Sequence, residues 1–146
     1  MPNLSSIGFI RDLSAMNLRP FGIRSYYYTS TTGADDEQKR IGKLLWELNF
    51  APVVFKKAKR RDRTKGVDIT LSKDVLSHAF QDNYDVAILV AGDGDYVPLV
   101  MELKRLGKVV SVAFFSNSGM SPDLRLASDN FYELEAVFIE AWRSIQ

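Results

Sequence analysis

The chain has 146 residues, with 19 lysine and arginine residues against 18 acidic ones, one histidine and no cysteine. Without cysteine there can be no disulfide framework and no cysteine-based zinc site, so we expect a reducing, cytoplasmic environment. The lone His78 excludes a His-rich metal site, and no stretch is long and apolar enough to predict a membrane span. At this length we expect a single domain over residues 1–146.

Hydrophobic patterning predicts strands and helices that alternate along the chain. In the first half, a strand, a helix, a strand and a helix are expected at Ile23–Ser30, Asp35–Asn49, Pro52–Lys56 and Val67–Gln81. In the second half, the expected order is a strand, a helix, a strand, a short helix, a short strand and a terminal helix, at Asp85–Gly92, Tyr96–Leu106, Val109–Phe115, Leu124–Ser128, Phe131–Leu134 and Glu135–Ser144. This alternation predicts an α/β fold, a three-layer α/β/α sandwich on a mostly parallel sheet, in which ligands bind outside the carboxyl ends of the strands.

The motif Gly92-Asp93-Gly94-Asp95 directly follows the most apolar predicted strand. Two carboxylates one residue apart repel each other unless a cation or hydrogen-bond donors compensate, and the glycines permit a sharp turn that aims both acids at one spot. Hard oxygen ligands suit Mg²⁺ or Mn²⁺. The alternative, in which Asp95 only caps the following helix, explains Asp95 but leaves Asp93 unexplained.

A basic run lies between two of the predicted elements. Residues 56–65 contain seven basic residues and one acid, a local charge of +6, while the other 12 basic and 17 acidic residues give −5. The near-neutral total therefore hides a strongly polarised chain. Such a run is either a solvated surface loop or a site that binds phosphates in a salt-sensitive way, and its candidate RNA-binding residues are Lys56, Lys57, Lys59, Arg60, Arg61, Arg63 and Lys65.

Three further aspartates have two interpretations each. Asp68 stands at the start of a predicted helix, as a cap or as a site residue, and Asp74 lies about 120° further round that helix, as a flanking or a solvated residue. Asp129 precedes a predicted strand and is either a turn residue or a ligand at the rim of the site. Asn117 and Asp123 are expected to be ordinary loop residues.

The ordered set of motifs resembles the NYN domain family of PIN-like nucleases. The resemblance rests on Lys65–Asp74, Tyr84–Leu99, Leu106–Val109 and Leu126–Phe131. It implies an α/β/α fold and a ribonuclease that uses Mg²⁺ or Mn²⁺ held by a ring of acids. On this sequence, the family's principal acidic positions fall on Asp68, Asp93 and Asp95, and secondary positions fall on Asp74 and Asp129.

One element of the family pattern has no good counterpart. Family members open with a strand that ends in an aspartate closely followed by an asparagine, whereas Ile7–Ile10 with Asp12 and Asn17 has different spacing. The domain is therefore expected to be incomplete at its N-terminus. We predict a metal-dependent ribonuclease that hydrolyses RNA phosphodiester bonds, with a non-catalytic RNA-binding or protein-interaction module as the alternative, and homo-oligomerisation is left open.

Overall fold

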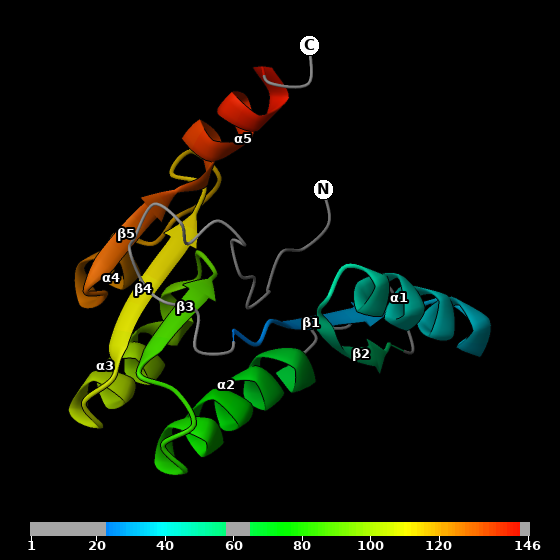
Figure 1. Ribbon diagram of the computed structural model, residues 1–146, viewed down its shortest axis with the longest axis horizontal. Helices are drawn as coiled ribbons and strands as arrows, with labels where there is room; N and C mark the ends of the chain where they lie inside the picture. Colours follow the sequence, from blue (N-terminus) through cyan, green and yellow to red (C-terminus); the bar gives the residue numbers. More distant parts are fainter. Residues whose placement is uncertain (1–22, 58–64, 144–146) are drawn as a thin grey trace. The chain divides into compact units, whose positions relative to one another are not determined.

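The computed structural model describes residues 23–57 and 65–143, in which parallel strands alternate with helices (Figure 1). The chain divides into two compact units, Met1–Leu71 and Ser72–Gln146, and each has its own parallel sheet. The α/β class with parallel strands, predicted from the sequence, is confirmed. The N-terminal segment with Asp12 and Asn17 lies outside the described residues.

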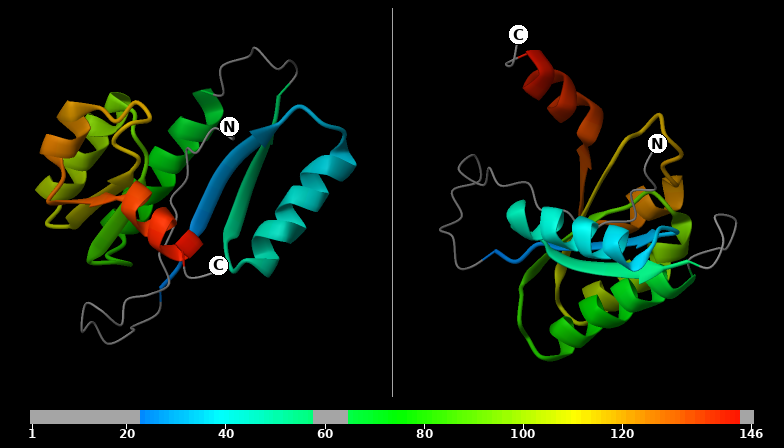
Figure 2. Two further views of the ribbon diagram at one scale, coloured as in Figure 1. Left: turned by 90° about the horizontal axis from the view of Figure 1, so that it is seen from above. Right: turned by 90° about the vertical axis from the view of Figure 1, so that its right-hand side faces the viewer.

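The first unit contains a two-stranded parallel sheet with one face covered by α1 (Figure 2). Its elements are β1, α1 and β2, at Tyr26–Thr31, Asp35–Glu47 and Ala51–Lys56. Gln38 of α1 donates from Nε2 to the carbonyl oxygen of Val54 at 2.7 Å, which fastens the helix to β2. Alternation along β1 buries one of its three consecutive tyrosines, Tyr28, to 1% exposure.

The next helix, α2 (Lys65–Phe80), begins in the first unit and ends in the second. It starts two residues before the predicted position, so Asp68 lies inside its first turn instead of capping it. Three of the predicted apolar positions are buried at four-residue spacing: Leu71, Val75 and Ala79. Phe80 was expected on the same face but is 65% exposed, because it lies about 100° round the helix from the residue before it.

The second unit is built on a three-stranded parallel sheet in the order β3-β4-β5 (Figure 1). After the end of α2, its elements are β3, the 3₁₀ turn η2, α3, β4, α4, β5 and α5, at Val86–Val90, Gly94–Tyr96, Val97–Arg105, Val109–Phe114, Pro122–Ala127, Asn130–Glu133 and Leu134–Arg143. α3 and α4 lie side by side (Figure 2). The predicted strand–helix–strand unit around α3 is confirmed by the parallel pairing of β3 with β4.

The two most apolar strands differ in burial. β4 lies between two strands, and its Val110, Val112 and Ala113 are fully buried. β3 pairs with β4 alone among the described strands of its sheet, and Leu89 is the one buried residue of its five. Burial on both faces, which continuous apolar runs predict for both strands, therefore holds for β4 and not for β3.

A buried lysine, Lys108, lies at the edge of the second unit where the strands begin. The Lys108 side chain is only 6% exposed, is paired with the Asp82 carboxylate and lies with Nζ 5.6 Å from the centre of the Tyr84 ring. The Tyr84 hydroxyl donates to the carbonyl oxygen of Val75 at 3.0 Å, and burial raises the pKa of Tyr84 to about 12. These contacts join the end of α2 to the sheet of the same unit.

No helix in the described ranges has both the length and the apolar character that a bilayer crossing requires.

Candidate functional site

The two aspartates of the predicted acidic motif lie in a tight turn just beyond the carboxyl end of β3. Asp93 and Asp95 are both exposed and are separated by Gly94 at the start of η2. This is the sheet edge at which parallel α/β folds bind ligands. The predicted location of the pair is thus the observed one.

Asp93 is the residue that caps the turn. Its Oδ1 accepts a hydrogen bond from the backbone N–H of Asp95 at 3.0 Å, and its carbonyl oxygen accepts from the N–H of Tyr96 at 3.2 Å. The sequence suggested that Asp95 would cap the next helix, but the N-cap of α3 is Tyr96, which makes no side-chain cap. The capping bond engages one of the two carboxylate oxygens of Asp93.

The two glycines of the turn are required by close packing and not by unusual backbone angles, which corrects the prediction. The described glycines with positive φ are Gly107 and Gly119, and neither belongs to this turn. A Cβ atom on Gly92 would lie 2.3 Å from a ring carbon of Phe114, and one on Gly94 would lie 2.9 Å from Oγ of Ser121. Both neighbours come from the segment that runs from β4 to α4, so this segment sits directly against the acidic turn.

Ser121 makes one hydrogen bond to the turn and one to the helix that follows it. Its N–H donates to the carbonyl oxygen of Gly92 at 2.8 Å, and its Oγ accepts from the N–H of Leu124 at 3.3 Å, which caps α4. The same residue therefore starts a helix and holds the turn that carries Asp93 and Asp95.

The site predictions missed a group of polar residues at the ends of β4 and β5. Glu133 accepts from Ser116 through both of its carboxylate oxygens: Oε1 from the N–H at 3.1 Å, and Oε2 from the hydroxyl. Next to them, Nδ2 of Asn117 donates to Oε2 of Glu135 at 2.8 Å. A sequence signal was present, because Ser116 and Asn117 directly follow one predicted parallel strand, while Glu133 and Glu135 lie at the end of the next.

Hydrogen bonds keep Glu133 ionised. The Ser116 hydroxyl and then the Ser116 N–H hold the pKa of the Glu133 carboxyl below its usual value; burial opposes them, and the Glu135 N–H and Arg125 add to the lowering. Glu133 is therefore an anion whose oxygens are occupied by donors from its own chain.

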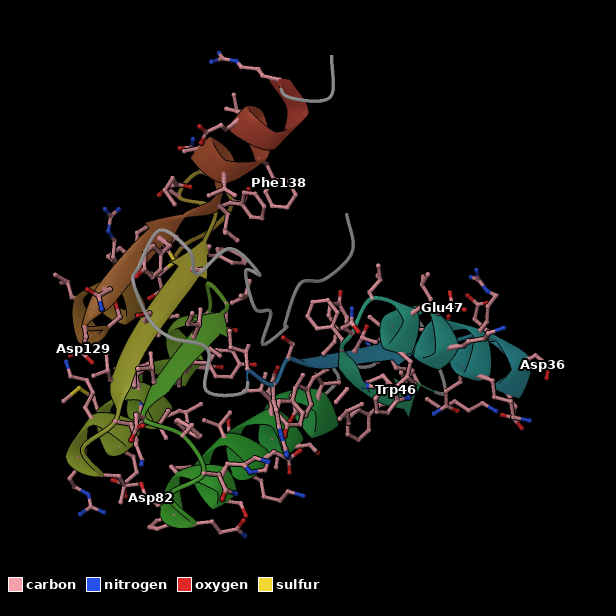
Figure 3. All side chains as sticks on the ribbon, viewed as in Figure 1. Asp36, Trp46, Glu47, Asp82, Asp129 and Phe138 are labelled. Carbon is pink, nitrogen blue, oxygen red and sulfur yellow. The ribbon has the colours of Figure 1, made fainter. Side chains whose placement is uncertain are left out.

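Asp129 lies at the opposite edge of the same sheet, so of its two predicted interpretations the contacts fit the turn residue and not a ligand at the rim of the site. Its Oδ2 accepts from the N–H of Val110 at 2.8 Å and its Oδ1 lies 3.2 Å from Nζ of Lys104. The Val110 bond, followed by Lys104, holds the pKa of Asp129 low. Because a strand rises about 3.3 Å per residue, four residues of β4 separate this position from the carboxyl end by about 13 Å (Figure 3).

The two α2 aspartates lie in different units. Asp68 is exposed in the first turn of α2, where the helix dipole favours a negative charge. Asp74 is partly buried, and its Oδ1 lies 3.0 Å from Nζ of Lys73.

The described part of the basic run begins at the end of β2. Nζ of Lys56 lies 2.5 Å from Oδ1 of Asp35, and this bond holds the pKa of Asp35 below its usual value. Lys57 is half-buried, and its N–H donates to the carbonyl oxygen of Thr31 at 2.8 Å. The other predicted phosphate-binding positions lie outside the described residues or, for Lys65, have no described side chain: Lys59, Arg60, Arg61, Arg63 and Lys65.

The donor set of the acidic turn fits a small hard cation. Within the described ranges no three His, Cys, Asp or Glu side chains come together as a metal-binding group. Mg²⁺ is commonly held by only one or two protein carboxylates, with waters and substrate phosphates as its other ligands. Asp93 and Asp95, both exposed to solvent, supply that number of carboxylates.

Comparison with known proteins identifies the family. The family model of the NYN domain matches residues 7–135. Among solved structures, the fold is similar to the crystal structure of a protein of unknown function from Vibrio parahaemolyticus, with a TM-score of 0.61 and 25% identity over 77% of this chain and 68% of that one. No curated protein matches the sequence.

Proposed function

The chain belongs to the NYN domain family, and from this premise we propose that it is a divalent-metal-dependent ribonuclease that hydrolyses RNA phosphodiester bonds. The observation that carries the proposal is the pair of exposed carboxylates, Asp93 and Asp95, in a braced turn at the carboxyl end of β3. A family suited to nuclease chemistry and a turn suited to a hard cation lead to the same class of reaction.

We assign Asp93 and Asp95 to the metal, Mg²⁺ or Mn²⁺, and add Asp68 on the family resemblance. A bound cation supplies the charge that activates water for in-line attack and stabilises the departing 3′ oxygen. The chain's own part is positioning: Asp93 fixes the turn through its bond to the N–H of Asp95, while the packing of Phe114 and Ser121 against Gly92 and Gly94 keeps the turn from shifting. Asp74 is a flanking residue in this proposal.

RNA is the proposed partner because the positive charge of the chain is concentrated in residues 56–65, while the rest of the chain carries a net negative charge. The run from Lys56 to Lys65 would neutralise several backbone phosphates of a bound RNA. The paired Lys56 would exchange its bond to Asp35 for a phosphate contact. The cysteine-free sequence suits a reducing compartment, so we propose that the protein acts in the cytoplasm.

The test is cleavage of a 5′-labelled single-stranded RNA with Mn²⁺. We expect Asp93→Asn to lower the cleavage rate by about 100-fold or more, since a metal-held phosphoryl site depends on ligand charge. The matched control is Asp123→Asn, at an exposed aspartate in the first turn of α4. Cleavage that survives Asp93→Asn, or that needs no divalent metal, contradicts the assignment.

A second function, a non-catalytic RNA-binding module, is favoured by one observation: Ile7–Ile10 with Asp12 and Asn17 does not have the spacing of the family's first aspartate and asparagine. It predicts salt-dependent RNA binding without metal-dependent cleavage, and affinity that Asp93→Asn leaves unchanged or raises. In both cases replacing Lys59, Arg60 and Arg61 by glutamine should reduce the slope of log affinity against log salt by about 2. Cleavage by the wild-type protein therefore separates the two functions.

A further inference from the structure

The segment between β4 and α4, residues 115–121 and here termed the β4–α4 loop, is attached at both of its ends (Figure 1). At one end Glu133 of β5 accepts from the N–H and the hydroxyl of Ser116. At the other end the N–H of Ser121 donates to the carbonyl oxygen of Gly92 at 2.8 Å. The loop is therefore a mechanical link between the last residue of β5 and the acidic turn.

The carboxylate of Glu133 accepts three hydrogen bonds from donors of its own unit. Besides the two bonds from Ser116, its Oε1 accepts from the N–H of Glu135 at 3.3 Å. Asp93, by contrast, commits Oδ1 to a single backbone N–H. Metal ligation and hydrogen-bond acceptance use the same lone pairs. Asp93 therefore keeps more acceptor capacity for a cation than Glu133, whose two oxygens both accept hydrogen bonds.

We infer that Glu133 is a positioning residue for the acidic turn, acting through Ser116 and the β4–α4 loop to fix where Asp93 and Asp95 stand. The catalytic consequence rests on the proposed ribonuclease function, whereas the positioning itself does not. Residues that orient metal ligands without binding the metal affect metal affinity strongly. Glu133 would act in this way through Ser116 and the β4–α4 loop.

The test compares Glu133→Ala with Glu133→Gln, and both with the control Glu140→Ala. Glutamine keeps one acceptor oxygen for the N–H of Ser116 and an amide that can donate to its hydroxyl, while alanine keeps neither. Glu140 is a second glutamate of the same unit, exposed on α5, and lies outside the β4–α4 loop contacts. The three variants therefore separate loss of the anchor from loss of a negative charge.

The first readout is amide exchange by NMR, which needs no catalysis. We expect the N–H groups of Ser116 and Ser121 to exchange about tenfold faster in Glu133→Ala, as for a lost hydrogen bond. Glu133→Gln should restore most of the protection, and Glu140→Ala should not change it. Unchanged exchange at Ser121 in Glu133→Ala overturns the inference, because the loop would then not transmit the anchor.

The second readout is the Mn²⁺ concentration that gives half-maximal RNA cleavage. It should rise about tenfold in Glu133→Ala, with the KM for RNA within twofold of wild type. A purely structural role would reduce the folded fraction and leave this Mn²⁺ requirement unchanged, and that result also overturns the inference. If the wild-type protein cleaves no RNA, the proposed function fails, and the exchange measurement still decides the role of Glu133.

Discussion

Substituting Gly92 by alanine tests the close packing behind the acidic turn. The added Cβ would lie 2.3 Å and 2.4 Å from two ring carbons of Phe114 and 3.0 Å from a third. Carbon atoms in contact prefer about 3.5–4.0 Å, so the overlap exceeds 1 Å. Phe114 is the last residue of the central strand, and its ring packs edge-on against Phe115 with centroids 5.9 Å apart. Relief therefore requires a shift of the ring or of the turn.

Overpacking of this kind costs about 1–3 kcal/mol in the free energy of unfolding, which for a chain of this size lowers Tm by roughly 3–9 °C. Urea unfolding followed by circular dichroism gives the free energy directly. Gly42→Ala is the control: it places a Cβ with no neighbour within 4 Å inside α1, and should stabilise the protein by about 0.5–1 kcal/mol. The double variant Gly92→Ala/Phe114→Ala locates the cause, because removing the ring should abolish most of the cost. An equal cost of Gly92→Ala in both backgrounds refutes the reasoning.

Two further predictions concern the edge of the second unit where the strands begin. Lys108 holds the pKa of Asp82 below its ordinary 3.8, so the pair stabilises the fold above about pH 4, and this contribution is lost as the pH falls through the lowered pKa. The difference in free energy of unfolding between wild type and Asp82→Asn, measured in urea titrations, should therefore shrink below about pH 4. A difference that persists at lower pH contradicts the ion-pair explanation. Asp129→Ala leaves the N–H of Val110 without its acceptor and removes the charge that pairs with Lys104, whose Nζ still donates to the carbonyl oxygen of Ala127 at 2.9 Å. The change should cost about 1–2 kcal/mol in urea unfolding, while the Mn²⁺ requirement for cleavage stays at the wild-type value. A raised Mn²⁺ requirement would return Asp129 to the metal site.

The sequence predicted the order of strands and helices well because local patterns determine it. Continuous β-branched runs marked β3 and β4, and acids at the start of α1 marked its N-terminus. The same local logic placed Asp93 and Asp95 at the carboxyl end of β3. The apolar run of β3 also predicted burial on both faces, and this prediction was wrong, because an apolar run does not reveal how many strands pair with it.

The role of each acid depended on contacts that are distant in sequence. The neighbour that requires glycine at position 92 is Phe114, 22 residues away, and spacing within the motif carries no trace of it. Asp129 could have been placed correctly, since a residue that precedes a parallel strand lies at the amino edge, away from the ligand-binding end. By the same reasoning, Ser116 and Glu133 lie at the carboxyl ends of predicted strands, where ligands bind, and the sequence could have identified them as site candidates.

The capping bond of Asp93 decides how its substitution must be interpreted. Asparagine keeps an oxygen that can accept from the N–H of Asp95, so Asp93→Asn preserves the turn and removes the charge, whereas Asp93→Ala removes both. A loss of cleavage in Asp93→Asn with unchanged exchange of the Asp95 N–H would therefore report on the charge needed by a metal. The same loss seen only in Asp93→Ala, with faster exchange at Asp95, would report on the turn. Because the two variants differ in this one acceptor, their comparison distinguishes a ligand from a cap at a residue that the structure allows to be both.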